Sequence, residues 1–435
     1  MFVKKFYNLG KNKLFPICRS ITGNGVRKTL KIIKKNFPKL KIYEVPSGTK
    51  IFDWKVPSEW NISDAYVIDK NNVKIIDFKK NNLHIISYSK PINKILTKKT
   101  LFKNIYSLPK QKSAIPYITS YYKRYWGFCI SHKQKIFFEK KYKKKDKFKV
   151  VIKSNFKTKG SLTYGELVIP GKSKKEILIS TYVCHPSMAN NELSGTIVSL
   201  CLIKYFSQFK NLNKSLRFIF IPETIGSITY LNKNLNLLKQ NVIGGYNLSC
   251  IGDDRQYSCM LSKYQNSPSD SAIIEAFKKL KTKFKKYSFL ERGSDERQYN
   301  SPGIDLPITS IFRTMYGKYP EYHTSLDDFN LVTEKGIRGG FKVAKTAIEL
   351  LLKKIIPTNN ILCEPQLGKR GLLPNLSNLS DSSNKEKYIH SNKLLSFLQF
   401  ADGKNDLNRI SKLIKINYKE SLEIYKMLLK AKLIN

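Results

Sequence analysis

Strand patterns and amphipathic-helix patterns alternate along residues 176–354, and this alternation restricts the fold more than any other feature of the chain. The predicted strands are 176–183, 215–221, 242–249 and 306–312, and the predicted helices are 192–209, 227–238, 269–283 and 334–354. Strands that alternate with helices in this way form a mostly parallel, doubly wound α/β sheet with helices on both faces. Ligands bind such sheets at the carboxyl ends of the strands. Functional residues are therefore expected in the loops that follow these strands.

The same α/β pattern opens the chain, before a segment of different character. Apolar residues at helical spacing predict a helix over 25–37, which Pro38 ends before a strand at 40–45. Between 52 and 147, short strand-like segments rich in aromatic residues predict an inserted β-rich domain. The α/β domain then comprises residues 1–51 and 148–355.

The end of the chain has two further parts. Residues 356–388 are rich in Pro, Asn and Ser, which predicts a linker. Residues 389–435 contain three short amphipathic helical patterns and predict a small domain of winged-helix size.

The net charge of +47, from 79 basic and 32 acidic residues, raises the question of a nucleic acid partner. A general excess of Lys explains the charge better, because basic residues are not concentrated in the tail. Residues 391–435 hold 9 basic and 4 acidic residues, a net charge of +5 that matches the density of the whole chain. We therefore expect no nucleic acid partner.

The compartment is inferred from the cysteines and the apolar segments. Seven cysteines without a CxxC pair fit a reducing cytoplasm better than a disulfide framework. The N-terminus lacks the apolar run of a signal peptide, and the apolar stretches are shorter than the roughly 18–20 residues that span a bilayer. We expect a soluble cytoplasmic protein without a membrane partner.

Three side chains that suit a metal follow predicted strands. His185 begins the loop after the first strand, Glu223 lies at the carboxyl end of the second, and His323 follows the fourth. Neutral imidazole and carboxylate oxygen are preferred zinc ligands, so the more specific interpretation is a zinc site at the carboxyl ends of these strands. The simpler interpretation is that each His is an ordinary loop residue. Convergence of the three side chains within about 5 Å is expected for a shared ion, and a separation of His185 and His323 beyond about 10 Å would exclude it.

Arginine is rare in this Lys-rich chain, yet four of the arginines cluster among these motifs: Arg255, Arg292, Arg297 and Arg313. Arg presents a planar fork for carboxylate or phosphate. The cluster indicates either a site for an anionic substrate group or ion pairs with Asp295 or Asp254, and ordinary surface positions are the alternative. The aromatic segment from Tyr117 to Phe128 is either core of the inserted domain or a wall over the active site.

Several motifs together resemble a known group of proteins. The segments are PICRSITGNGVRKTL, VPSGTKIFDWKVP, TYVCHPSMANNELSG, PETIGS, IGDDRQYS, GSDERQYNSPGIDLP and YPEYHTSLDDF. The chain resembles an uncharacterised aminopeptidase-like family with an inserted domain and a C-terminal winged helix. That family is similar to the clan of cocatalytic zinc aminopeptidases, which also contains glutaminyl cyclases and glutamate carboxypeptidases.

The resemblance implies roles for individual residues. His185 matches the first metal-binding His, Asn191 the metal-bridging Asp, and His323 the last metal ligand. Glu223 matches the first of two adjacent Glu, a general base in the clan, where the second is a ligand, and here Thr224 stands in the second position.

Three departures weaken a second metal position. Asn191 is neutral, although Glu192 is adjacent to it, and Thr224 replaces a Glu. Ser249 aligns with a position where another ligand Asp is expected, although Asp253 or Asp254 could compensate. A neutral amide cannot replace a bridging carboxylate between two dications. We therefore expect one well-held zinc and a second that is weak or absent.

We assign Asp295, Arg297, Arg313 and Tyr322 to substrate binding. The function expected from residues and resemblance together is zinc-dependent hydrolysis of an amide bond in a peptide or acylated small molecule. One alternative is a non-catalytic protein that binds zinc or a ligand, connected by resemblance to surface polysaccharide biosynthesis. A DNA-binding regulator is a weaker alternative, and a homo-oligomer is left open.

Overall fold

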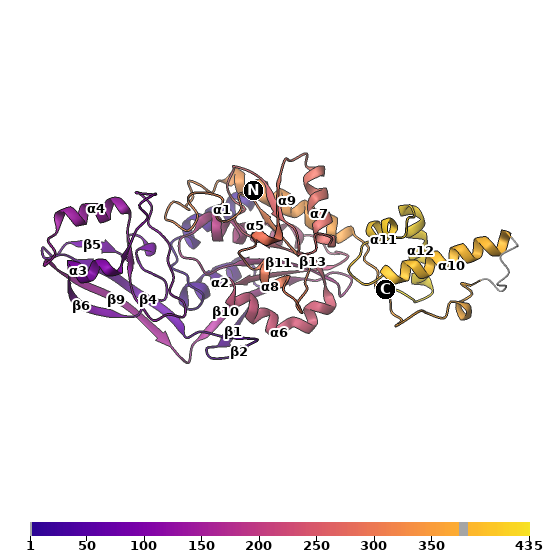
Figure 1. Ribbon diagram of the computed structural model, residues 1–435, viewed down its shortest axis with the longest axis horizontal. Helices are drawn as coiled ribbons and strands as arrows, with labels where there is room; N and C mark the ends of the chain where they lie inside the picture. Colours follow the sequence, from indigo (N-terminus) through magenta and orange to yellow (C-terminus); the bar gives the residue numbers. More distant parts are fainter. Residues whose placement is uncertain (1, 374–381) are drawn as a thin grey trace.

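An eight-stranded sheet forms the centre of the computed structural model, which describes residues 2–373 and 382–435 (Figure 1). In spatial order its strands are β1 (Lys41–Pro46), β10 (Ser161–Ile169), β12 (Ser215–Ile221), β11 (Glu176–Tyr182), β13 (Val242–Leu248), β16 (Ile308–Phe312), β14 (Ser258–Met260) and β15 (Lys285–Tyr287). The central strands β12, β11, β13 and β16 are parallel, whereas β10 and β14 join them antiparallel. The expected α/β class with a mostly parallel sheet is confirmed.

Helices cover both faces of this sheet because its central strands are apolar on both sides. In β12, Leu216, Phe218 and Phe220 belong to one hydrophobic core and Ile219 and Ile221 to the other. The first core is covered by α1 (Phe2–Leu9), α2 (Asn24–Asn36), α5 (Ser194–Phe206), α7 (Pro268–Lys279) and α9 (Glu334–Lys353). The second is covered by α6 (Ile225–Asn241) and α8 (Glu296–Tyr299). In Figure 1, α5, α7 and α9 lie above the sheet and α6 lies below it.

Short helical turns occur at several loops. The 3-10 turns are Asn82–His84, Phe102–Asn104, Phe289–Glu291 and Gly368–Arg370, and the π-helical turns are Gly10–Leu14 and Ala189–Leu193. The helix predicted from residue 192 therefore begins as a π-helical turn that precedes α5. Such turns often occur at functional sites, and this one carries Asn191.

The inserted domain lies at one end of the molecule (Figure 1). Its antiparallel four-stranded sheet consists of β5 (Lys74–Asp77), β4 (Glu59–Ile68), β9 (Lys147–Lys157) and β6 (Ile92–Thr97). The smaller elements are β2 (Lys50–Ile51), β3 (Trp54–Lys55), α3 (Lys98–Leu101), β7 (Ile105–Tyr106), β8 (Phe128–Cys129) and α4 (His132–Lys141). Because β9 pairs with β4 and β6, this sheet continues to Lys157, beyond the boundary predicted at 147.

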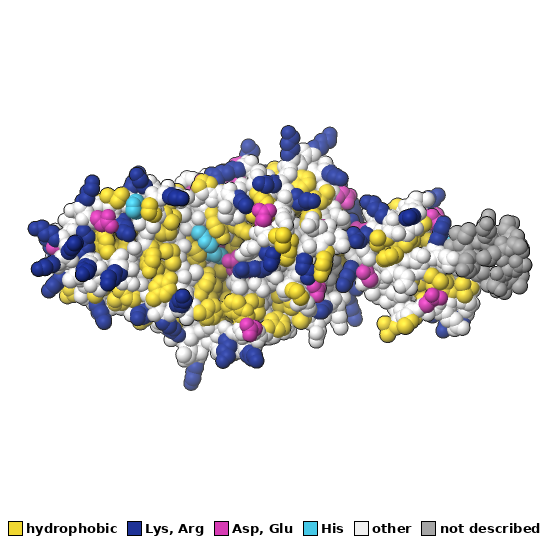
Figure 2. Space-filling model, viewed as in Figure 1, with side chains coloured by type: hydrophobic (Ala, Val, Ile, Leu, Met, Phe, Trp, Pro, Cys, Tyr) yellow, Lys and Arg dark blue, Asp and Glu magenta, His cyan; other side chains and the backbone are white. Residues whose placement is uncertain are grey.

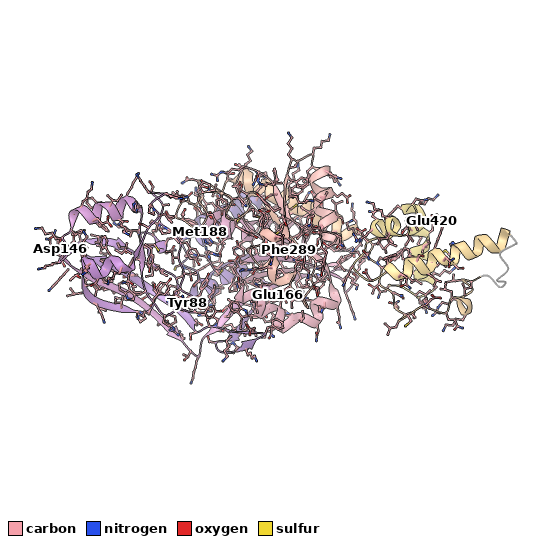
Figure 3. The ribbon with its side chains drawn as sticks, viewed as in Figure 1. Tyr88, Asp146, Glu166, Met188, Phe289 and Glu420 are labelled. Atoms are coloured by element: carbon pink, nitrogen blue, oxygen red, sulfur yellow. The ribbon has the colours of Figure 1, made fainter. Side chains whose placement is uncertain are left out.

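The inserted domain packs against the loops that follow the central sheet. Met188 is buried with Leu83 and Tyr117 at this junction (Figure 3). Pro116 forms an isolated β-bridge with Thr324, and the backbone N–H of Ser325 donates to the carbonyl oxygen of Ile115 at 2.8 Å. The insertion is thereby fixed to the loop that carries His323.

The tail contains α10 (Ser382–Phe400), α11 (Leu407–Leu413) and α12 (Tyr418–Lys430), the three helices expected. The predicted linker 356–388 is wrong in part, because Leu367 is buried in the core of the tail and Asn359 forms a β-bridge with Ile434. Helix α10 also begins inside the predicted linker, and residues 374–381 of that linker lie outside the described residues.

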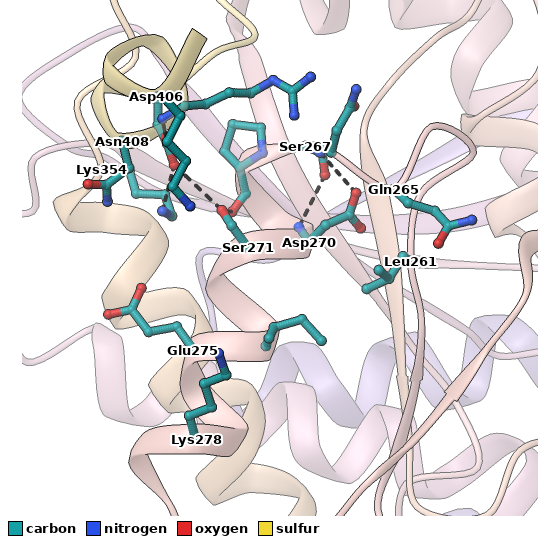
Figure 4. Close-up of a pocket in the computed structure, with 15 residues that line it drawn as sticks. Leu261, Gln265, Ser267, Asp270, Ser271, Glu275, Lys278, Lys354, Asp406 and Asn408 are labelled. Atoms are coloured by element: carbon teal, nitrogen blue, oxygen red, sulfur yellow. Dashed lines mark hydrogen bonds and ion pairs between the residues drawn. The ribbon is translucent and has the colours of Figure 1, made fainter. Parts of the chain in front are cut away.

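One buried ion pair connects the tail to the sheet domain. Lys354, directly after α9, contacts Asp406 at 2.6 Å, and both side chains are less than one-tenth exposed. Asp406 also caps α11 by accepting the N–H of Arg409. Figure 4 shows this pair beside Ser271 of α7, next to the Ser267 and Asp270 side chains that cap α7. In the described part of the chain, no helix combines the length and the apolar character needed to cross a membrane.

Candidate metal centre

Three loops bring the predicted metal-site residues together. Cys184 and His185 follow β11, Glu223 follows β12, and His323 lies in the long connection between β16 and α9. Thr224 and His323 have positive φ angles of 61° and 55°. Such angles are rare for residues other than glycine and tend to occur at functional sites.

The two histidines lie side by side. Their ring centroids are 5.5 Å apart, and the Nε2 atom of His185 is 3.6 Å from an oxygen of Glu223. The Nε2 atom of His323 is buried and has no hydrogen-bond partner among the described residues. Burial, together with the neighbouring His185, lowers the pKa of His323 to about 3, so its imidazole is neutral. The two rings are closer than the separation of about 10 Å that would exclude a shared site.

Aromatic rings enclose the two imidazoles. Tyr117 of the inserted domain lies 5.3 Å from His185 and 5.2 Å from His323 between ring centroids, and Tyr322 stacks on His323 at 3.9 Å. The backbone N–H of Tyr117 donates to the carbonyl oxygen of His323 at 2.8 Å. The aromatic segment of the insertion therefore contributes a wall of the site as well as core.

Glu223 combines burial with limited access to solvent. Burial raises the pKa of its carboxyl group, although the neighbouring His185 opposes this shift. The hydroxyl of Ser294 donates to Oε1 at 2.6 Å, and the side chain remains 21% exposed. In Figure 2 a histidine and an acidic side chain lie together in a hollow near the middle of the face shown. A carboxylate in this setting can exchange a proton with a water molecule or a substrate.

Asn191 lies in the same neighbourhood. Its side-chain nitrogen donates to the hydroxyl of Tyr182 at 2.6 Å, and the ring of Tyr182 is 5.3 Å from that of His185. Asp327 accepts the backbone N–H of Asn191 at 3.0 Å, and burial raises the pKa of Asp327 to about 6. Within the described part of the chain, the side-chain oxygen of Asn191 is buried without a hydrogen-bond partner.

Asp253 has a different role from the one predicted. Its carboxylate accepts hydrogen bonds from Asn190 Nδ2, the backbone N–H of Arg255, and both the N–H and the hydroxyl of Thr314. These four donors occupy its two oxygens, so Asp253 is not free to replace a missing metal ligand. It instead connects the turn that carries Asn190 to the loop after β13.

The predicted substrate residues separate into two groups. Arg297 and Tyr322 lie at the site, whereas Asp295 and Arg313 are buried and contact other residues of the protein. Arg297 is exposed and donates to the hydroxyl oxygen of Thr224 at 2.7 Å, and Tyr322 covers His323, so both lie at the site. Asp295 is buried and accepts the N–H of Thr224 at 2.8 Å, which orients the loop after Glu223. Burial and the neighbouring Glu223 raise the pKa of Asp295 to about 7.

Arg313 belongs to the second group, with structural contacts. Its guanidinium lies over the ring of Tyr257 at 3.7 Å and 4.0 Å from Asp254, and the residue is 5% exposed. This ion pair was the alternative considered for the arginine cluster, and it explains Arg313 without a substrate.

The sequence analysis did not identify every residue of this site. Arg19 is fully buried and donates to Glu192 at 2.6 Å, while Glu192 contacts Nδ1 of His185 at 2.8 Å. The signal for Arg19 was available, because it is a rare Arg in the motif PICRSITG. Ser294 carried no comparable signal, since its role depends on the fold of the loop before α8.

Comparisons with known proteins bear on the family and the fold of the chain. A family described as a domain of unknown function, DUF4910, matches residues 7–354, and a winged helix-turn-helix family matches residues 355–435. A relative from Clostridium acetobutylicum, named provisionally as a polysaccharide biosynthesis protein with an aminopeptidase-like domain, is 42% identical over 96% of this chain and 92% of its own length.

Solved structures show the same fold. A crystal structure from Clostridium acetobutylicum, named provisionally as a peptidase, is 39% identical with a TM-score of 0.78, covering 100% of this chain and 96% of the other. A zinc aminopeptidase from Bacillus subtilis is 13% identical with a TM-score of 0.58, over 80% of this chain and 93% of its own. The aminopeptidase-like fold and the C-terminal winged helix are thereby established.

Proposed function

The chain belongs to the DUF4910 family, and we propose that it is a zinc-dependent hydrolase that cleaves an amide bond in a peptide or an acylated small molecule. One observation carries the proposal. The imidazoles of buried His185 and partly buried His323 lie 5.5 Å apart between ring centroids, beside a carboxylate, and the buried Nε2 atom of His323 has no hydrogen-bond partner within the described ranges 2–373 and 382–435. A buried ring nitrogen without a partner is costly unless a cation or another ligand completes it.

The donor set fits one zinc ion. His185 and His323 would hold it through their Nε2 atoms, and the side-chain oxygen of Asn191 supplies a neutral donor nearby. When bound, zinc polarises a carbonyl group and lowers the pKa of a coordinated water. A second ion is disfavoured, because Asn191 and Thr224 provide no charge where two carboxylates would be needed.

The residues around this position suit amide hydrolysis. Glu223 would accept a proton, because burial raises its pKa and Ser294 fixes one of its oxygens. The rings of Tyr117 and Tyr322 would restrict water around the histidines. Exposed Arg297 would bind an anionic group of the substrate as a planar fork.

The substrate class is left broad between peptides and acylated small molecules. The relative named for polysaccharide biosynthesis supports including sugar-linked amides among the candidates. Neutral Asn191 and Thr224 favour a second candidate function, a zinc- or ligand-binding protein without turnover.

Metal analysis combined with a substrate screen separates these functions. The purified protein should contain about one zinc per chain and hydrolyse at least one member of a panel of aminoacyl, N-acyl and N-acylated sugar substrates. Glu223→Gln should remove the turnover while retaining zinc. Zinc without turnover by the wild-type protein would support the binding function, and absence of zinc under conditions that load a zinc aminopeptidase would refute the metal site.

A further inference from the structure

We propose that Glu192 and Arg19 form a positioning pair that holds His185 with its Nε2 atom towards the metal, and that Glu192 is not itself a ligand. This inference rests on the metal site proposed above. Ligand atoms of Cys184, His185 and Glu192 lie within 4.8 Å of one another, so distance alone would also permit a metal between these three residues. The hydrogen bonds around Glu192 argue against that arrangement.

Both oxygens of the Glu192 carboxylate are occupied. Oε1 accepts a hydrogen bond from Nε of Arg19 at 2.6 Å. Oε2 accepts from the backbone N–H of Cys184 at 2.9 Å and from that of His185, and it lies 2.8 Å from Nδ1 of His185. A carboxylate offers about four acceptor positions, two on each oxygen, and three of these four contacts fall on Oε2. A metal on Oε2 would have to displace a buried donor, and a metal on Oε1 would lie beside the Arg19 guanidinium.

Cys184 is engaged as well. Its sulfur accepts the backbone N–H of Glu223 at 3.2 Å, so it connects the loop after β11 to the loop after β12. Cys184 and Glu192 therefore fix the backbone around His185 and Glu223. The sulfur of Cys184 also lies 3.5 Å from Nδ1 of His185, the nitrogen that Glu192 contacts, so a metal at Cys184 would compete with these contacts.

The contact with Glu192 sets the tautomer of His185. Because the carboxylate oxygen accepts, Nδ1 carries a proton, which leaves Nε2 as the ring nitrogen that a metal would bind. The same Nε2 atom faces Glu223 at 3.6 Å. A carboxylate behind a metal-binding imidazole is a common way to orient the ring and increase its basicity.

Arg19 completes this support from the N-terminal segment. It is fully buried, and besides Glu192 it donates to the carbonyl oxygens of His185 at 3.0 Å and Leu14 at 2.6 Å. Its Nη2 atom has no partner among the residues that the structure describes. A buried ion pair is weak support for stability by itself, so an incompletely satisfied pair directly behind a site residue points to a positioning role.

The test measures zinc affinity rather than turnover. Zinc dissociation constants are determined by competition with a chromogenic chelator for the wild type, Glu192→Gln and Arg19→Lys. Gln keeps the size of Glu192 but has one acceptor oxygen, so it cannot serve Arg19 and His185 together. We expect Glu192→Gln to weaken zinc binding by about 10- to 100-fold. Arg19→Lys should also weaken it, because a single ammonium cannot reproduce the three contacts of the guanidinium.

The absorption spectrum of the cobalt-saturated protein separates positioning from ligation. If Glu192 is not a ligand, saturated Glu192→Gln should show the spectrum of the wild type, since the atoms around the ion are unchanged. A different coordination spectrum at saturation would make Glu192 a ligand and overturn the proposal.

Glu176→Gln is the matched control for lost stability. Glu176 forms a buried ion pair with Arg217 at 2.6 Å, at the first residue of β11 rather than after its last. This variant should lose stability yet keep the zinc affinity of the wild type. Equal zinc affinity of Glu192→Gln and wild type would overturn the positioning role. Failure of the wild type itself to bind zinc would refute the proposed metal site, a distinguishable result.

Discussion

Replacing Asn191 with Asp should convert a weak second metal position into an occupied one. Asn191 is 1% exposed, and its side-chain oxygen has no hydrogen-bond partner in the described part of the protein. The substitution preserves the size of the side chain, and the hydroxyl of Tyr182, now an acceptor at 2.6 Å, can turn to donate to the new carboxylate. The wild type lacks the negative charge that would hold a second cation at this position, and the substitution supplies it.

The expected stabilisation of Asn191→Asp by zinc follows from the neighbouring carboxylate of Asp327. Asp327 accepts the N–H of residue 191 at 3.0 Å, so the metal-free variant holds two acidic groups close together. Two like charges roughly 5 Å apart at an effective dielectric constant of about 20 repel by about 3 kcal/mol. An additional zinc at 100 times its dissociation constant would contribute about 2.7 kcal/mol. Zinc should therefore stabilise Asn191→Asp more than it stabilises the wild type.

The assay combines zinc content with urea unfolding in chelator and in zinc. Zinc should rise from about one towards two per chain in Asn191→Asp. Asn190→Asp is the matched control, because the side chain of Asn190 already contacts Asp253 and Gly252, so this variant should lose stability without gaining zinc. The reasoning is refuted if the wild type already holds two tightly bound ions, or if Asn191→Asp holds one and zinc stabilises both proteins equally.

Three further predictions concern Glu223, Arg297 and Glu59. Glu223→Gln should lower kcat by about 10²- to 10⁴-fold with zinc content retained, and loss of zinc in this variant would identify Glu223 as a ligand instead. Arg297→Gln should raise KM about tenfold for substrates that carry a carboxylate, and an equal effect on neutral analogues would contradict the anionic contact. Burial opposes ionisation of Glu59, but hydrogen bonds from Arg27, Asn61 and Ser161 lower its pKa to about 2. Its ordinary value is 4.5, so its contribution to stability is fully present above pH 4.5 and is lost as the pH falls towards 2. The stability difference between wild type and Glu59→Gln in urea unfolding should therefore be larger at pH 7 than at pH 3, and a constant difference would contradict this assignment.

The sequence predicts the central sheet well because its signals are local. Continuous apolar runs indicate buried strands, and the predicted strand 215–221 agrees with β12. The boundary of the inserted domain is harder to predict from local sequence patterns. Strand β9 begins at Lys147, 88 residues after β4 begins at Glu59, and no local pattern specifies that these two strands pair. The linker prediction failed for a related reason, since composition rich in Pro and Asn does not reveal that Leu367 is buried against the tail.

The sequence identified the candidate metal ligands and the candidate base, but not the residues that support them. His185, Glu223 and His323 were recognisable because each chemically suitable side chain follows a strand or a motif. Arg19 lies 173 residues from Glu192, so its contact depends on the complete fold. Asp253 shows the converse, because an acidic residue beyond a strand looked available until its four hydrogen bonds were known.

Diffraction at the zinc absorption edge tests the central claim most directly. Crystals of the wild-type protein grown with zinc should give an anomalous peak between the Nε2 atoms of His185 and His323, whose rings are 5.5 Å apart. His323→Ala should lose the peak, whereas His132→Ala in the inserted domain should retain it. Absence of a peak at the two histidines of the wild type, or its persistence in His323→Ala, would contradict the proposed metal centre.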